Sequence, residues 1–559
     1  ARRTSPTNMG LALLANLSAY DFGYLPAGRL IERTRNAFAT MHKLERHRGH
    51  FCNWYDTQSL QPLLPVYVST VDSGNLAGHL LTLRPGLVAL ADQPILAARW
   101  IDGLDDTFRA LLAAAPQLVA GALLRFQQEL ESALADRPST LPAAHRVLEL
   151  LAAYAAQLAG DLDEESRIEA GSEADAWTRA LDRQCRDALD ELTFLVPPSA
   201  MPDMNGIPTL RELAAQGVSH ARDRMEEIAQ LGLQAGEMAR MDYDFLYDEV
   251  RHLLAIGYHV TERRRDASYY DLLASEARLA VFVAIAQGQL PQQSWFALGR
   301  LLINAGSGAT LLSWSGSMFE YLMPLIVMPA YDNTLLDESC RAAVRRQIEY
   351  GAQRGVPWGM SESGYNTVDA ALTYQYRAFG VPGLGLKRGL GEDLVIAPYA
   401  SALALMVEPE AACENLQRLA ADGILGKFGF YEAIDYTPAR LRRAETRAVV
   451  RSFMAHHQGM SLLSLAHLLL DRPMQRRFVS DPLFQATLLL LQERIPRANV
   501  RYSSDTERVD SRAAAETLEM PMRVFSTPDT RMPGVQLLSN GRYNVMITNA
   551  GGGYSCWKD

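Results

Sequence analysis

The sequence has few cysteines, and they are isolated from one another. Five occur among 559 residues, with no Cys-x-x-Cys pair and no Cys/His spacing suited to zinc. They are Cys52, Cys185, Cys340, Cys413 and Cys556. A disulfide framework is therefore not expected, in agreement with a reducing compartment, and we predict no metal site and no cofactor.

Long hydrophobic runs are also missing. The two most apolar segments, 76–98 and 448–470, are interrupted by polar residues or proline before the roughly 20 apolar residues that a membrane span requires. No secretory signal is predicted, because no basic region followed by an apolar stretch opens the chain. Residues 1–8 instead lead us to expect a soluble fragment of a longer protein, without a membrane span of its own.

Clusters of basic residues and low-complexity tracts are absent too. The formal net charge is −10, and binding to nucleic acid needs gathered Lys and Arg to neutralise phosphates. We therefore expect no nucleic-acid partner and favour a neutral or polar substrate. Short repeats do not appear, which argues against a solenoid.

Helical periodicity is the dominant pattern in what remains. Residues 75–195 carry Ala and Leu at three- and four-residue spacing, and a Pro-rich break follows at 196–202. Beyond it, helices are predicted at 209–232, 269–287, 338–355, 367–379 and 443–470. After Pro521, short strands around an Asn-Gly turn indicate a β-like tail. We predict a mainly α fold, a helical toroid whose loops build a cleft at one rim.

The predicted organisation has four parts. They are an N-terminal segment contributing to the cleft (1–74), a helical subdomain (75–200), a catalytic toroid (201–520) and a tail that starts a following domain (521–559).

Three segments place a glutamate among aromatic and small residues. Glu320 lies in 313–324, Glu362 in 358–366 and Glu432 in 430–436. Sugars offer flat apolar faces and a rim of hydroxyls, so a sugar cleft needs aromatic platforms beside carboxylates. Glycoside cleavage also needs two carboxyl groups. Each segment alone is more often a helix cap or a buried ion-pair partner, and the three candidates are equivalent at this point.

Other segments mix polar and aromatic residues. His456 and His457 are adjacent, so on a helix they point about 100° apart and do not form a metal site. Such a histidine bonds a backbone carbonyl or a sugar hydroxyl equally well. The loop 383–391 lacks the Gly-Lys-Ser/Thr ending of a phosphate loop, so Arg388 is expected at the cleft rim. Trp54 and Asp56 are further cleft candidates, and Asp72 is either a helix cap or a third.

Seven strings carry a family resemblance that spans almost the whole chain. They occupy 3–8, 53–56, 69–79, 317–324, 386–389, 431–436 and 456–460. They resemble the central, glucoamylase-like region of bacterial cyclic β-1,2-glucan synthases. The resemblance implies an (α/α)6 toroid similar to endo-β-1,2-glucanases, with an additional N-terminal helical region and the short β-rich tail. It also implies an anomer-retaining transfer that closes linear β-1,2-glucan into a ring.

The resemblance further assigns roles and partners. It implies Glu432 as nucleophile and either Glu320 or Glu362 as acid/base. The expected sugar contacts are Trp54, Asp56, Asp72, Trp314, Tyr365, Arg388, Tyr431, Asp435, Tyr436, His456, His457 and Gln458. The expected partners are linear β-1,2-glucan and the other domains of a parent membrane protein, at the cytoplasmic side of the inner membrane. Two alternatives remain: an endo-β-1,2-glucanase that hydrolyses the glucan, and a non-catalytic glucan-binding module.

Overall fold

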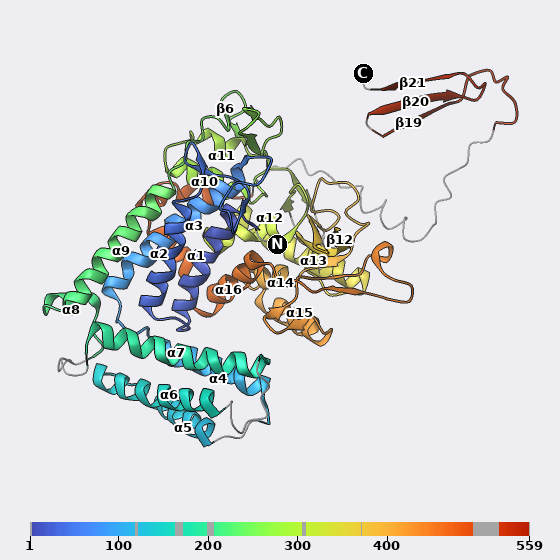
Figure 1. Ribbon diagram of the computed structural model, residues 1–559. Coiled ribbons are helices and arrows are strands. Elements are labelled where there is room, and N and C mark those ends of the chain that lie inside the picture. Colours follow the sequence, from blue (N-terminus) through green and yellow to red (C-terminus); the bar gives the residue numbers. More distant parts are fainter. Residues whose placement is uncertain are drawn as a thin grey trace. The chain divides into compact units, whose positions relative to one another are not determined.

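The computed structural model describes residues 3–117, 121–161, 171–197, 206–304, 309–370, 372–495, 525–540 and 542–557. The chain divides into two compact units, Ala1–Ser504 and Asp505–Asp559, and each is described by itself. The first is mainly helical (Figure 1). Its helices are α1 (Pro6–Asp21), α2 (Ala27–Met41), α3 (Thr70–Val88), α4 (Trp100–Ala114), α5 (Gly121–Ala135), α6 (Leu141–Asp161), α7 (Glu173–Leu195), α8 (Leu210–Ala215), α9 (Ser219–Met238), α10 (Ala277–Ala286), α11 (Gln293–Ala297), α12 (Met318–Leu322), α13 (Leu335–Arg354), α14 (Pro398–Ala404), α15 (Pro409–Ala421), α16 (Ala455–Leu469), α17 (Pro473–Ser480) and α18 (Pro482–Gln485).

The strands of the first unit are short and form small antiparallel sheets. They are β1 (Arg3–Thr4), β2 (Arg46–His47), β3 (His50–Phe51), β4 (Tyr55–Asp56), β5 (Tyr67–Ser69), β6 (Tyr247–Asp248), β7 (Leu253–Leu254), β8 (Gly257–His259), β9 (Arg264–Arg265), β10 (Leu302–Asn304), β11 (Ala309–Leu311), β12 (Ser363–Val368), β13 (Tyr374–Arg377), β14 (Val395–Ile396), β15 (Leu425–Gly426), β16 (Gly429–Phe430), β17 (Ala433–Asp435) and β18 (Ala448–Val450). None of these sheets closes into a barrel.

Side-chain caps fix where several helices begin. Ser5, Ser69 and Thr334 accept backbone N–H groups in the first turns of α1, α3 and α13, which satisfies donors that have no partner within the helix. The α12 helix starts with a reciprocal capping box between Ser317 and Glu320. The capped N-termini of α1, α3 and α12 also carry residues of the candidate site described below.

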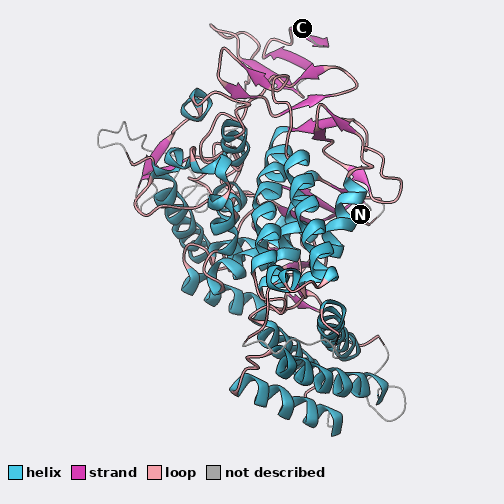
Figure 2. Cartoon of the chain, turned by 90° about the vertical axis from the view of Figure 1, so that its left-hand side faces the viewer, coloured by secondary structure: helices cyan, strands magenta, loops and turns pink. Residues whose placement is uncertain are grey.

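A closed circuit of helices surrounds the core of the first unit. The α3 helix packs on α1 and α10, α1 packs on α16, α16 on α14, and α14 on α12. Arg278 of α10 completes the circuit, because its guanidinium donates to the carbonyl oxygens of Glu320 and Tyr321 in α12. Figure 2 shows the long helices of this body running side by side. Gly74 permits the close approach of α3 to α10, since a Cβ there would lie 2.1 Å from Ala280 Cβ.

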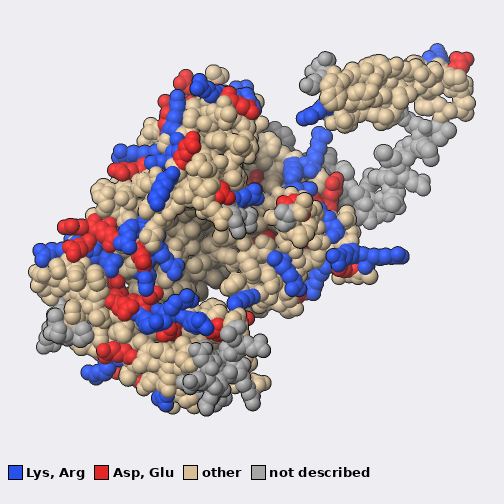
Figure 3. Space-filling model, viewed as in Figure 1, with Lys and Arg blue, Asp and Glu red and all other residues tan. Residues whose placement is uncertain are grey.

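Helices α4 to α7 form a separate helical layer beside α2 and α9 (Figures 1 and 2). An ion pair of 2.7 Å joins Arg29 of α2 to Asp187 of α7, and Arg224 of α9 lies 3.1 Å from Glu191 of α7. On the face shown in Figure 3, charged side chains of both signs are intermixed. No helix among the described residues is long and apolar enough to cross a membrane.

Four predicted helices differ from the structure. The one predicted at 209–232 is two helices, α8 and α9, separated by a turn at 216–218. The stretch 367–379 is not helical; it belongs to the hairpin of β12 and β13, whose turn is closed by a hydrogen bond from the Thr373 N–H to the Asp369 side chain. The other two begin later than predicted, at Ala277 and at Ala455, because the residues before them form loops and, at β18, a sheet strand. The helix-like composition of this stretch predicted a helix, whereas pairing of β13 with β12 determined the outcome.

The second unit contains one antiparallel sheet of β19 (Val535–Ser539), β20 (Tyr543–Thr548) and β21 (Gly553–Trp557). The Asn540 side chain accepts the N–H groups of Arg542 and Tyr543 in the turn between β19 and β20, so the strands predicted around this turn are present. The predicted domain limits at 200 and 521 lie outside the described residues.

Candidate active site

Polar side chains gather where the six helices of the circuit begin. Each sits at the N-cap or in the first turn of its helix. They are Thr7 of α1, Asp72 of α3, Glu276 of α10, Glu320 of α12, Tyr399 of α14 and His457 of α16. Thr7 bonds Asp72 directly, and Tyr399 stacks on His457. Helix N-termini favour negative charge, so this rim of the circuit, with its carboxylates, is the candidate active site.

Glu320 holds the loop in front of α12. Its carboxylate accepts the backbone N–H groups of Trp314 and Ser315, each at 3.1 Å, and that of Ser317 at 3.1 Å. The hydroxyls of Ser313, Ser315 and Ser317 bond the same group. Both oxygens are thus occupied, which favours a structural role for this carboxylate.

Glu362 lies directly before β12 and is half-buried. Its backbone is fixed by the Tyr399 hydroxyl, which lies 2.9 Å from the Glu362 carbonyl oxygen. Within the described part of the chain, no side chain or N–H group bonds its carboxylate. Burial, followed by the negative charges of Glu276, Glu320 and Asp72, raises the pKa of Glu362 to about 8. This carboxyl group is free to meet a ligand and holds its proton near neutral pH.

Glu276 is a carboxylate that sequence reasoning missed. It occupies the N-cap position of α10, is half-buried, and is met by the Ser275 hydroxyl at 3.3 Å. Burial and then the charge of Glu320 raise the pKa of Glu276 to about 7. The charge of Glu276 is also the largest electrostatic contribution to the raised pKa of Glu362. Glu276 and Glu362, called the carboxyl pair below, therefore lie close enough to influence each other's protonation.

Asp72 and Thr7 adjoin the carboxyl pair. The Thr7 hydroxyl donates to Asp72 at 2.6 Å, and burial raises the pKa of Asp72. The charges of Asp72, Glu276 and Glu362 all raise the pKa of the Tyr270 phenol well above its usual value, after burial as the first cause. The predicted cleft residue Asp72 is therefore part of the rim, brought there by the α1 and α3 contact.

Glu432 is buried, with 2% of its surface exposed. One oxygen accepts the Gly364 N–H at 2.9 Å, and the other lies 3.0 Å from His457 Nδ1. The His457 ring stacks on Tyr399 with centroids 3.7 Å apart. Its Nε2 lies 3.3 Å from the Tyr376 hydroxyl. Glu432 thus faces the interior and supports the strand that follows Glu362.

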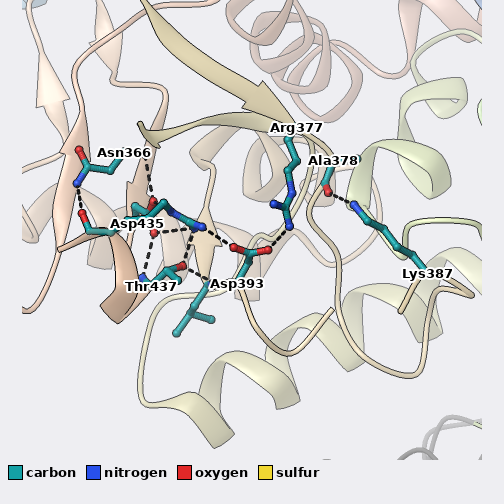
Figure 4. A network of polar contacts seen from close by, with 9 residues as sticks. Asn366, Arg377, Ala378, Lys387, Asp393, Asp435 and Thr437 are labelled. Carbon is teal, nitrogen blue, oxygen red and sulfur yellow. Dashed lines mark hydrogen bonds and ion pairs between the residues drawn. The ribbon is translucent and has the colours of Figure 1, made fainter. Parts of the chain in front are cut away.

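Asp435 belongs to a network of ion pairs (Figure 4). One oxygen accepts the Asn366 N–H at 3.0 Å and the Arg440 Nε at 2.6 Å, and the other accepts the Thr437 N–H at 2.9 Å. Arg440 also bonds Asp393 at 2.5 Å. Both oxygens of Asp435 therefore have protein partners, and the network ties β12 to β17.

Comparison with known proteins shows which family the chain resembles. The chain is 39% identical over 574 residues to cyclic β-(1,2)-glucan synthase NdvB of Rhizobium meliloti strain 1021. The alignment covers 100% of this chain and 19% of that protein, so the chain spans about a fifth of the relative's length. Residues 268–482 match a family model described as glycoamylase, a putative glucoamylase. The predicted resemblance to cyclic β-1,2-glucan synthases is confirmed.

Two further findings concern the tail and the fold. Residues 518–559 match the supersandwich domain of glycosyl hydrolase 94. An endo-β-1,2-glucanase from Chitinophaga pinensis, solved with sophorotriose and glucose, superposes with a TM-score of 0.50 at 14% identity over 88% of each chain. At 14% identity, this superposition indicates a shared fold only.

Several predicted sugar contacts lie within the glycoamylase region. Trp314 is 45% exposed, and its indole N–H donates to Asp271 at 3.1 Å, so its ring is available as a platform. Tyr365 is covered by the guanidinium of Arg440, 5.0 Å from the ring centre. Arg388 is exposed.

Of the four others, Tyr431, His456 and Gln458 lie near the start of α16. Tyr431 packs on Phe453 with ring centres 5.1 Å apart, and Gln458 donates to a backbone carbonyl. His456 lies against His457, with ring centres 4.1 Å apart, and burial lowers its pKa well below the usual value. Tyr436 is half-buried. A cavity of about 260 Å³, lined in part by Tyr431 and Gln458, opens beside these residues.

The N-terminal candidates lie outside the glycoamylase region. Arg3 lies over the Trp54 ring, 4.5 Å from its centre. Asp56 accepts the N–H groups of Gln58 and Ser59 in its own turn. The charge of Asp72, in contrast, raises the pKa of Glu362, so Asp72 lies near the carboxyl pair. Within the described residues, no three His, Cys, Asp or Glu side chains are grouped as metal ligands would be.

Proposed function

We propose that this chain closes linear β-1,2-glucan into rings by an anomer-retaining transfer, using Glu276 and Glu362 as the two reacting carboxyl groups. The observation that carries the proposal is the placement of two carboxyl groups in one rim, where burial and neighbouring carboxylates raise the pKa of both and where no side chain or N–H group of the described residues bonds the Glu362 carboxylate. The synthase relationship along the full chain supports the substrate and the reaction.

The protonation of the pair suits glycoside chemistry. One carboxyl group must carry a proton for the leaving 2-oxygen while the other, ionised, attacks the anomeric carbon. Two acids that are partly buried close to each other do not readily ionise together, so near neutral pH one retains its proton. Glu276 and Glu362 meet this condition, whereas both oxygens of Glu320 and both oxygens of Glu432 are bonded to protein groups.

Ring closure requires that a sugar hydroxyl, and not water, takes the glycosyl group. Holding the glucan's own chain end next to the intermediate gives that hydroxyl a high effective concentration. Aromatic rings near the rim supply faces for such positioning. They are Tyr270, Trp314 and Tyr376.

We also propose the (α/α)6 toroid as the architecture. The closed circuit of α1, α3, α10, α12, α14 and α16 supports an inner ring of six helices. The site then lies at the rim formed by their N-terminal ends.

The proposed setting is a larger membrane-bound synthase whose other domains supply the linear glucan and whose cytoplasmic side carries this site. The 19% coverage of the relative supports the larger protein. The five cysteines, none of which is disulfide-bonded, suit a reducing compartment.

The test is to incubate the protein with linear β-1,2-glucan and follow reducing ends together with the masses of the products. Ring products at constant reducing power are expected. The released fragment keeps the original reducing end, and the anomeric carbon of the cleaved bond is joined to the chain's own 2-hydroxyl without becoming free. Rising reducing power would instead identify an endo-β-1,2-glucanase, and unaltered glucan would identify a binding module.

Matched variants locate the reacting groups. Glu276→Gln and Glu362→Gln should each lower turnover by about 10³-fold or more, since each removes an acid or a nucleophile. Glu414→Gln, the same change on the exposed face of α15, serves as the control and should leave turnover unchanged. Full turnover by Glu362→Gln would refute the assignment.

A further inference from the structure

A line of three hydrogen-bonded side chains leads from the interior to the rim. Glu432 lies at the buried end, His457 is in the middle at 3.0 Å, and Tyr376 follows at 3.3 Å from His457 Nε2. The side chains of Glu432 and His457 are 1% and 2% exposed, whereas Tyr376 is 38% exposed. The line therefore connects two enclosed groups to one that a ligand can reach.

His457 joins the other two groups of the line. Its Nδ1 faces Glu432 and its Nε2 faces the Tyr376 hydroxyl. A phenol offers one O–H and its lone pairs, so the contact with Nε2 leaves the Tyr376 oxygen able to form a further hydrogen bond.

Tyr376 is placed beside Glu362. Burial, and then the charges of Glu362, Tyr399 and Glu432, raise the pKa of Tyr376 well above its usual value, so it remains a phenol. The hairpin gives the same placement: Tyr376 in β13 pairs across from Gly364 in β12, two residues after Glu362.

Glu432 restrains both strands at this pairing. One of its oxygens accepts the N–H of Gly364, and the other reaches Tyr376 through His457. Stacking of the His457 ring on Tyr399 fixes the plane of the imidazole. The orientation of Tyr376 is thus determined by buried groups before any ligand arrives.

We propose that Tyr376 binds the substrate by a hydrogen bond with a hydroxyl of the glucose unit beside Glu362, and that His457 and Glu432 are positioning residues that act through it. The inference rests on the proposed function in taking a β-1,2-glucan as the ligand of this rim. It adds a polar sugar contact and the pair of residues that orient it.

The test is a double-mutant cycle on the full chain. Tyr376→Phe removes one hydroxyl, and His457→Gln removes the imidazole that orients it. Each should lower kcat/KM for linear β-1,2-glucan by about 3- to 10-fold, the range for one hydrogen bond between neutral groups. The double variant should be no worse than the more impaired single variant, because the two changes break one linked contact.

The control is Tyr374→Phe, the same substitution on the same strand, which should leave kcat/KM unchanged. Thermal unfolding of every variant accompanies the kinetics. Multiplying losses in the double variant, or an unaltered kcat/KM for Tyr376→Phe, would overturn the inference, because the line would then have only a structural role.

A second readout separates this inference from the proposed reaction. Calorimetric titration with a short linear β-1,2-gluco-oligosaccharide is done in the Glu362→Gln background, with and without the cycle variants. If the chain binds this sugar but turns over no glucan, a 3- to 10-fold, non-multiplying loss of affinity still supports the line, while the proposed reaction fails. Absence of sugar binding would overturn both.

Discussion

Replacing Glu362 by Gln should stabilise the folded protein at alkaline pH while it removes activity. The folded-state pKa of Glu362 is raised from 4.5 to about 8. Between these values the folded chain keeps a proton that the unfolded chain has released, so the free energy of unfolding falls as pH rises through this window. Glutamine has no proton to release, and the penalty disappears with it.

The magnitude follows from the same values. At about 1.4 kcal/mol for each tenfold change in proton affinity, the full difference corresponds to roughly 5 kcal/mol. Because Glu362 is only half-buried, solvent screening reduces the expected gain to about 2 kcal/mol. A substitution that abolishes turnover but stabilises the fold is expected where a catalytic group lowers the stability of the folded protein.

Urea unfolding at pH 5 and at pH 8 measures the effect. Glu362→Gln should raise the free energy of unfolding at pH 8 and change it little at pH 5, where the wild-type carboxyl is already protonated. Glu414→Gln on the surface of α15 should alter neither value. A loss of stability at pH 8, or equal changes at both pH values, would show that Glu362 is a supporting group and refute the reasoning.

Three more results are expected. In a plot of kcat/KM against pH, activity should fall below about 7, where both members of the carboxyl pair are protonated, and above about 8, where both are ionised. Glu320→Gln should lower the free energy of unfolding at pH 7 by about 2 kcal/mol in urea titrations, because the charge that accepts the loop's N–H groups is lost. Gly74→Ala should lower it by about 1 to 3 kcal/mol, since the added methyl meets Ala280 where α3 and α10 touch, and an unchanged midpoint would mean that these helices readjust.

Local patterns predicted much of the helical content because amphipathic spacing and caps are properties of short segments. The helices around 209–238 and 335–354 are present close to where periodicity indicated them. The hairpin that carries Tyr376 was predicted as a helix. Strand β13 is stabilised by pairing with β12, and the local pattern of one segment does not show that pairing.

The site was predictable only in part for a related reason. Glu362 stood among aromatic and small residues, so it was among the candidates. Glu276 precedes an almost wholly apolar helix and has no such neighbourhood in sequence. Glu276 and Glu362 are 86 residues apart in the sequence. The closed circuit of helices brings them together, and neither segment alone encodes that proximity.

The family resemblance and the structure favour different roles for Glu432. The family resemblance implied a nucleophile, whereas its two oxygens bond Gly364 and His457 and its surface is almost fully enclosed.

A supporting group that is changed to its amide keeps one acceptor oxygen. Glu432→Gln should therefore retain a measurable rate, lowered about 3- to 10-fold, while Glu362→Gln falls by about 10³-fold or more. Side-by-side turnover of linear glucan decides the matter. If Glu432→Gln is as inactive as Glu362→Gln although its unfolding midpoint is unchanged, the carboxylate itself takes part in the reaction, and Glu432 must replace one member of the carboxyl pair.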